Sequence, residues 1–272
     1  MDPAEPSDPV GPVDPADRFV IVASAPEDEV RLDLALLLIA AAARPGVDVD
    51  GNLDALDDLA ARCPAPTLDA LVRHLFVEEG FTGNRDAYYD ARNSYLDLVL
   101  ERRLGIPITL AVLAMAVGRR LGVPVAGVSM PGHFLLRDRV DRDVFVDPFR
   151  GALLDAAGCE AVFRALHGPG AAFHPAFLAP VGAWTVLRRV LANLVGIHRA
   201  EGDRVALARV LRLRAGVPGA TPEERRELAD ALAAAGAFGD AAAELEALAA
   251  GEGSDQAEAD LTAATRYRAR LN

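Results

Sequence analysis

One segment constrains the fold of this chain more than any other. Residues 109–121 read TLAVLAMAVGRRL and are apolar on nearly every side until Arg119. A helix without a polar face is buried on most sides. The hydrophobic period then changes, because three short β-rich segments follow, at 123–129, 133–138 and 144–147. The sequence therefore predicts an α+β domain in which a central buried helix packs on a small antiparallel sheet.

Helical patterns lie on both sides of this core. Before it, a leucine stripe begins at Leu32, and further apolar patterns predict helices at 53–62, 68–79 and 93–103. From Val181 onward the chain is rich in alanine, and its turns predict two helical hairpins, at 186–213 and 221–250, with a closing helix at 256–271. Two hairpins fall short of the three repeats usually needed for independent stability, so we expect this module to dock on the first domain.

The first residues have a different character. Proline recurs at every third position, at Pro3, Pro6, Pro9, Pro12 and Pro15, among acidic residues. This period suits a polyproline II stretch, and we interpret it as a solvated tail because aromatic and basic recognition residues are missing. The predicted organisation is a disordered tail at 1–18, an α+β domain at 19–180 and an all-α helical module at 181–272.

Composition excludes several classes of function. The net charge of −12 disfavours nucleic acid and anionic membrane as the main partner. All 28 basic residues are arginine, which removes Schiff-base chemistry, a P-loop lysine and a Ser–Lys dyad. The histidines show no metal-ligand spacing, so we expect neither a metal nor a cofactor.

Cysteine usage and the apolar runs indicate the compartment. Only Cys63 and Cys159 occur, without a CxxC motif, which favours a reduced intracellular protein. The start of the chain lacks the basic and apolar regions of a signal peptide, and its longest apolar run, at 34–43, is too short to span a bilayer. We therefore expect a soluble, cytoplasmic protein that does not span a membrane.

The spacing of one histidine and one aspartate points to a site. If the second and third β-rich segments form a hairpin whose paired residue numbers sum to 280, residues 139–141 form the turn. His133 then lies directly opposite Asp147, with Cβ atoms ~5 Å apart. Spacing alone leaves two interpretations open: a catalytic pair, or a structural histidine bonded to a carboxylate at the end of a strand.

Many short blocks, in order, resemble the SirB-type family of transglutaminase-like proteins, whose bacterial members join this domain to a tetratricopeptide-like region. The matching blocks are 80–84, Tyr89, 93–96, Arg103, 105–108, Leu110, 121–122, 131–134 and 147–149. With the helical tail, the resemblance extends over nearly everything after the acidic segment. It implies a cysteine-protease-type α+β domain followed by a tetratricopeptide-like module.

The resemblance also implies roles for individual residues. The superfamily places a cysteine at the start of the buried helix, a histidine on the next strand and an aspartate on the strand after it. His133 and Asp147 match the last two positions. Counting back about four helical turns from Gly122 reaches Pro107. Proline suits a first helical turn but has no nucleophilic atom, so the resemblance implies that the nucleophile is lost.

Other residues are poor replacements for the missing nucleophile. Cys63 precedes a proline at a helix end, and Cys159 follows Asp155 in a predicted helix, so we expect both thiols to be inert. Ser94 and Thr109 are nearer the expected site. A hydroxyl, however, needs a stronger base than a thiol, and we expect Thr109 to bond locally.

Three functions remain open. The first is a non-catalytic transglutaminase-like protein, a pseudoenzyme that binds peptide or protein. The second is an atypical hydrolase or acyl-transfer enzyme that uses His133 and Asp147 without a thiol. The third is a structural adaptor that binds through the helical module.

The helical module also carries a charge pattern. Seven arginines lie between Arg188 and Arg214, followed by eleven acidic residues between 215 and 261. Either the two strips neutralise each other, or the basic strip, represented by Arg209 and Arg212, steers a charged partner. In the second case the acidic tail is itself a candidate cover for the basic strip.

Overall fold

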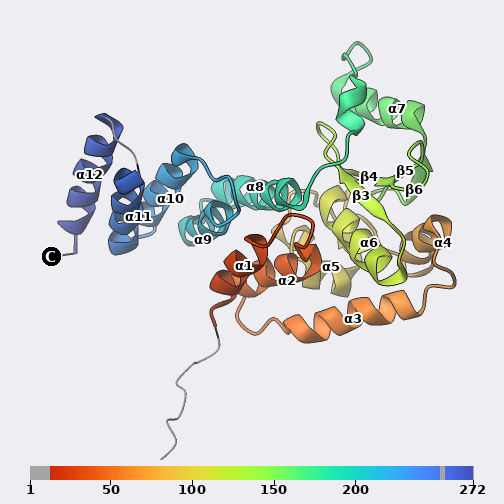
Figure 1. Ribbon diagram of the computed structural model, residues 1–272, viewed down its shortest axis with the longest axis horizontal. Helices are drawn as coiled ribbons and strands as arrows, with labels where there is room; N and C mark the ends of the chain where they lie inside the picture. The colour runs from red at the N-terminus through yellow and green to blue at the C-terminus, as the bar shows by residue number, and fades with distance from the viewer. Residues whose placement is uncertain (1–12, 252–254, 272) are drawn as a thin grey trace, which may run out of the picture.

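The computed structural model describes residues 13–251 and 255–271 (Figure 1). The disordered tail expected at 1–18 lies largely outside these residues. Its expected end at residue 18 is wrong. Helix α1 (Pro15–Ala23) begins at Pro15, where a first helical turn needs no N–H from the proline. Asp14 caps the helix by accepting a hydrogen bond from the Ala16 amide at 2.8 Å.

A group of helices surrounds the central one. They are α2 (Leu32–Ala43), α3 (Val49–Ala61), α4 (Leu68–Arg73), which continues as a π-helical turn (His74–Glu78), and α5 (Leu96–Arg102), preceded by a 3₁₀ turn (Ala91–Asn93). The helices expected at 53–62 and 68–79 are therefore confirmed. The helix expected from residue 93 begins later, because residues 84–95 form a loop with a single 3₁₀ turn.

The central helix is α6 (Pro107–Leu121), with Pro107 as its first residue and nearly every side chain buried. Thr109 Oγ1 accepts a hydrogen bond from the Ile106 amide at 3.2 Å, which stabilises the start of the helix. Gly122 ends it in the left-handed conformation, with φ of +73°. The prediction of a buried central helix is confirmed.

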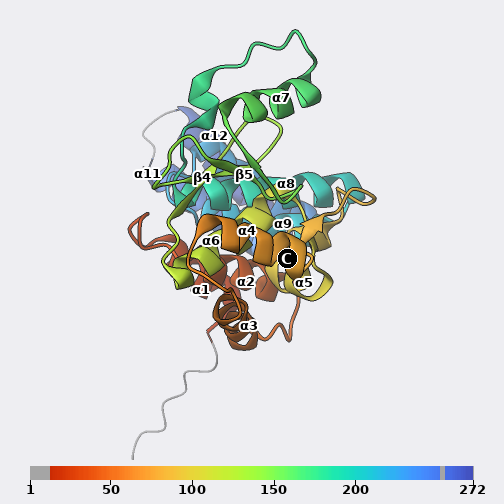
Figure 2. The same cartoon turned by 90° about the vertical axis from the view of Figure 1, so that its right-hand side faces the viewer.

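The main sheet is antiparallel, with strand order β3-β4-β5-β6. Its strands are β3 (Val125–Val128), β4 (Leu135–Asp138), β5 (Phe145–Asp147) and the unexpected β6 (Ala152–Leu154). A separate parallel pair is formed by β1 (Thr82–Gly83) and β2 (Leu104–Gly105). In Figures 1 and 2 the main sheet lies between α6 on one face and α7 (Ala156–His167) on the other.

The register of the β4–β5 hairpin differs from the expected one. Leu136 pairs with Val146, so paired numbers sum to 282 and the expected register is wrong by two residues. The cause is a longer turn, in which the carboxylates of Asp138 and Asp141 accept hydrogen bonds from the amides two residues ahead of them. A shift of two preserves which side chains share a face.

Within the described residues, five α-helices follow α7: α8 (Ala183–Glu201), α9 (Arg204–Ala215), α10 (Pro222–Ala234), α11 (Phe238–Gly251) and α12 (Asp255–Arg268). They follow one another away from the first domain (Figure 1). Successive helices from α8 to α12 pack on each other, so the helices expected in this region are confirmed. Among the described residues, no helix combines the length and the apolar character needed to cross a bilayer.

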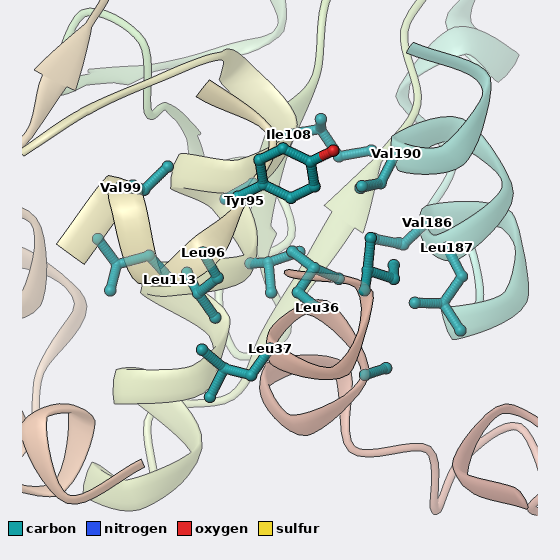
Figure 3. Close-up of a cluster of buried hydrophobic side chains, with 14 of the residues drawn as sticks. Leu36, Leu37, Tyr95, Leu96, Val99, Ile108, Leu113, Val186, Leu187 and Val190 are labelled. Atoms are coloured by element: carbon teal, nitrogen blue, oxygen red, sulfur yellow. The ribbon is translucent and has the colours of Figure 1, made fainter. Parts of the chain in front are cut away.

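The helical module docks on the first domain, as expected, and it does so through α8 and α9. Figure 3 shows side chains of α8 meeting those of α2, α5 and α6 in one buried cluster. The labelled residues are Leu36, Leu37, Tyr95, Leu96, Val99, Ile108, Leu113, Val186, Leu187 and Val190. The boundary expected at residue 181 therefore does not separate two cores, because α8 belongs to the core of the first domain.

Candidate functional site

His133 and Asp147 lie side by side. His133 Nε2 is 3.0 Å from Asp147 Oδ1, so the predicted proximity of the two side chains is confirmed. Asp147 is the last residue of β5, whereas His133 lies in the loop just before β4, so the prediction that His133 lies on a strand directly opposite Asp147 is wrong. The aspartate is fully buried and the histidine is 7% exposed. A carboxylate at this distance fixes the orientation of the imidazole ring.

Backbone amides hold the aspartate in place. Asp147 Oδ1 also accepts hydrogen bonds from the amide of Phe149 at 3.0 Å and from that of Arg150 at 3.3 Å. Its Oδ2 makes no hydrogen bond within the described residues, but Arg150 Nε lies 3.7 Å away. The carboxylate is therefore anchored through one oxygen and faces a guanidinium with the other.

The backbone of the His133 loop is fixed from two sides. Gly132 has a φ of +74°, a conformation that other residues rarely adopt, and it turns the chain into position for the histidine. From α8, Arg189 donates to the carbonyl of His133 at 2.8 Å, to that of Met130 at 3.1 Å and to Ser129 Oγ at 2.6 Å. Sequence patterns missed Arg189, because it lies in a helix assigned to another module.

Pro107 is the third residue of this site. It is the first residue of α6, and it lines the same cleft as His133. A helix N-terminus is the position at which a thiol would be activated, because unpaired N–H groups and the helix dipole stabilise a thiolate. Proline offers no atom that can attack a carbonyl carbon.

The cleft beside this pair has a volume of about 500 Å³. Its lining is mainly aromatic, apolar and cationic: Arg85, Tyr88, Tyr89, Pro107, Gly132, His133, Phe149, Arg150, Val162 and Leu166. Phe149 packs directly over Gly83, where an added Cβ would lie 2.2 Å from the ring. The guanidinium of Arg85 lies 5.9 Å from the centre of the same ring.

Buried polar contacts fix the loop that carries the two tyrosines. Asn84 Nδ2 donates to Asn93 Oδ1 at 3.0 Å, and Asn93 Nδ2 donates to the carbonyl of Ala87 at 2.7 Å. Thr109 Oγ1 donates to the carbonyl of Asn93 at 2.6 Å, and Ser94 Oγ accepts from Asn193 Nδ2 at 2.7 Å. Thr109 therefore bonds locally as expected, and both hydroxyl groups are fully buried.

The two cysteines lie outside the cleft lining. Cys159 is fully buried, and burial, together with the charges of Asp155 and Asp147, raises the pKa of its thiol to about 12. Cys63 Sγ lies 3.5 Å from the carbonyl oxygen of Ala65. Neither thiol replaces the missing nucleophile. In the described ranges, no group of three or more His, Cys, Asp or Glu side chains is placed to hold a metal ion.

The charged strips of the helical module contact each other. Arg212 pairs with Asp240, Arg188 with Glu224 at 2.9 Å, and Arg199 with Glu227. Arg209 Nη1 donates to the carbonyl of Ala43 at 3.3 Å, which links α9 to α2. These contacts favour mutual neutralisation of the two strips, and the hypothesis that Arg209 and Arg212 steer a charged partner stays a prediction.

Comparison with known proteins adds a family match. The model of the transglutaminase-like superfamily matches residues 39–192, a range that includes Pro107, His133, Asp147 and Arg189. Its end lies within α8, in agreement with the shared core. No solved structure shows significant similarity to the chain.

Several curated relatives also share sequence with this chain. A UPF0162 protein of Xylella fastidiosa strain Temecula1 is 48% identical over 140 residues, which is half of each chain. A UPF0162 protein of Pseudomonas aeruginosa is 34% identical over 181 residues, 63% of this chain and 66% of the relative. Human F-box only protein 21 is 36% identical over 145 residues, but these make up only 22% of that protein. The chain spans about half the length of the Xylella relatives it matches.

Proposed function

The chain belongs to the transglutaminase-like superfamily, and we propose that it is a non-catalytic member that binds peptide or protein segments in the cleft beside His133 and Asp147. The observation that carries the proposal is the residue at the start of α6, where Pro107 lines the cleft together with His133. Acyl transfer in two steps requires a nucleophile that forms a covalent intermediate, and proline cannot form one.

His133 and Asp147 can bind a ligand even though the site has no nucleophile. With Nε2 bonded to Asp147, the other ring nitrogen of His133, Nδ1, makes no hydrogen bond within the described part of the chain. A neutral imidazole held in this way presents an acceptor to a ligand N–H group. The surrounding aromatic and apolar side chains supply contact area of the kind that lines ligand-binding clefts.

The proposal also includes a more specific family, a type of helical module and a cellular location. The order of a transglutaminase-like domain and helical hairpins supports membership of the SirB-type family and a tetratricopeptide-like module. The match to a protein named as an F-box protein supports a role in protein binding. Both cysteines are free thiols, which supports a cytoplasmic location.

One observation favours a second candidate, an atypical hydrolase. The unbonded Nδ1 of His133, which lines the cleft, could accept a proton from an attacking water. This path lacks the covalent intermediate that divides the reaction in two. We therefore place it second.

Activity assays on the whole chain separate the two candidates. The protein would be incubated with glutamine-containing and ester substrates, and acyl adducts would be trapped and located by mass spectrometry. We expect no turnover, no adduct and no difference between the wild type and His133→Ala. Turnover that His133→Ala abolishes, while the exposed-surface control Arg204→Gln retains it, would establish the hydrolase instead.

Binding is tested with a displayed library of random heptapeptides. We expect the wild type and Arg204→Gln to select sequences that Tyr89→Ala does not retain. Tyr89 is 78% exposed, so its truncation leaves the fold intact. If the wild type selects no sequence, or if Tyr89→Ala retains the same ones, the binding function is wrong.

A further inference from the structure

The cleft differs in charge from the rest of the molecule. The chain as a whole carries a net charge of −12, yet its cleft lining includes two arginines and a histidine and no carboxylate. Asp147 lies below this lining, fully buried, and its charge is offset by Arg150 and by three hydrogen bonds. Arg85 makes no ion pair within the described residues, so its charge is available at the cleft.

Arg85 is available to a ligand. Its side chain is exposed, and its contact within the described residues is with the Phe149 ring. A guanidinium that rests on an aromatic face is held in one plane while its donors remain free, which favours bidentate pairing with a carboxylate.

Apolar groups border the same cleft. Tyr89 is 78% exposed and its ring packs edge-on against Tyr88, with ring centres 5.3 Å apart. Leu166 of α7, 51% exposed, also lines the cleft. An exposed aromatic and an exposed leucine beside a pocket are typical of a site that buries an apolar side chain of a partner.

We propose that the occupant of this cleft is an acidic peptide segment of a partner protein, whose carboxylate pairs with Arg85 and whose neighbouring apolar side chain packs between Tyr89 and Leu166. The proposal rests on the binding function proposed above and names its ligand class. A nucleic acid is a poorer fit, because its backbone carries a charge at every nucleotide, whereas the cleft lining offers few cations and the chain as a whole carries a net charge of −12.

The test extends the library selection. Sequences selected by the wild type should be enriched in Asp and Glu beside a large apolar residue, and Arg85→Gln should lose the acidic enrichment. A selected peptide and its copy with every acid replaced by the matching amide would then be compared by fluorescence anisotropy. We expect the acidic peptide to bind the wild type roughly fivefold more tightly, and Arg85→Gln to bind both equally.

The outcomes distinguish the two proposals. If the wild type selects peptides that depend on Tyr89 but shows no acidic enrichment, the acidic ligand is wrong and the binding function stands. If it selects no peptide at all, the binding function itself fails. If a 12-residue oligothymidine binds more tightly than the best acidic peptide, the proposed ligand class is wrong. Arg204→Gln controls for general charge effects and should behave as the wild type.

Discussion

Arg189 donates a hydrogen bond to the backbone carbonyl of His133 at 2.8 Å, so a helix of the C-terminal module fixes the loop that carries the site histidine. The same guanidinium bonds Ser129 and Met130 and lies over the ring of Phe134. Burial lowers the pKa of Arg189 below its ordinary value, but an arginine remains charged at neutral pH. The cleft and α8 therefore form one structural unit.

The first prediction concerns this contact. Arg189→Ala leaves three acceptors without their donor and should lower the free energy of unfolding by about 3 kcal/mol. Urea unfolding measures the loss. Because the role is one of positioning, Arg189→Ala should also weaken binding of a selected peptide under conditions in which the variant is fully folded. Arg204→Gln should change neither quantity, and an unchanged urea midpoint for Arg189→Ala would contradict the assignment.

Some features of this site can be predicted from the sequence, and others cannot. Side-chain parity predicts that His133 and Asp147 lie close together, and the structure shows this proximity although His133 lies in the loop before β4. Parity cannot give the register itself, which depends on how Asp138 and Asp141 bond within the turn. Arg189 could not be predicted, because only the fold brings it to its partners, two backbone carbonyls and the hydroxyl of Ser129, and no sequence pattern links them.

The second prediction restores a thiol. In Pro107→Cys the new side chain occupies the first position of α6, where the helix dipole and His133 should lower the pKa of the thiol below its ordinary value of about 8.5. Iodoacetamide should modify the introduced thiol faster at neutral pH than either native cysteine. The double variant with His133→Ala should require a higher pH for the same rate. Equal pH profiles for the two would show that His133 does not act on this position.

The third prediction concerns the native thiols. Cys159 is fully buried, and burial raises its pKa to about 12, so it should resist alkylation in the folded protein. Cys63 is partly exposed and should react first. Peptide mapping after iodoacetamide treatment, with and without urea, measures both. Modification of Cys159 without urea, at a rate similar to that of Cys63, would contradict its predicted inertness.

The last prediction concerns stability against pH, through a buried ion cluster beside α6. Asp33 is 2% exposed and bonds Arg31 at 3.0 Å, Arg119 at 2.9 Å and Arg120 at 2.8 Å. Burial alone would raise the pKa of Asp33, but hydrogen bonds from Arg31 and Arg120 and the charge of Arg119 hold it well below its ordinary value.

A carboxylate with a lowered pKa in the folded state contributes stability above its unfolded pKa of about 4, and this contribution is lost as the pH falls. Asp33→Asn should therefore lower the free energy of unfolding by about 3 kcal/mol at neutral pH. The difference from the wild type should shrink as the pH falls below about 4, when the unfolded wild type takes up the proton that its folded form resists. Urea midpoints of both proteins across this pH range measure the difference.

Asp57→Asn is the matched control, since Asp57 pairs with the same Arg120 but its side chain is 63% exposed. This substitution should change the free energy of unfolding little at any pH. A constant difference between Asp33→Asn and the wild type across the range would show that the carboxylate stabilises the fold by its shape and not by its charge.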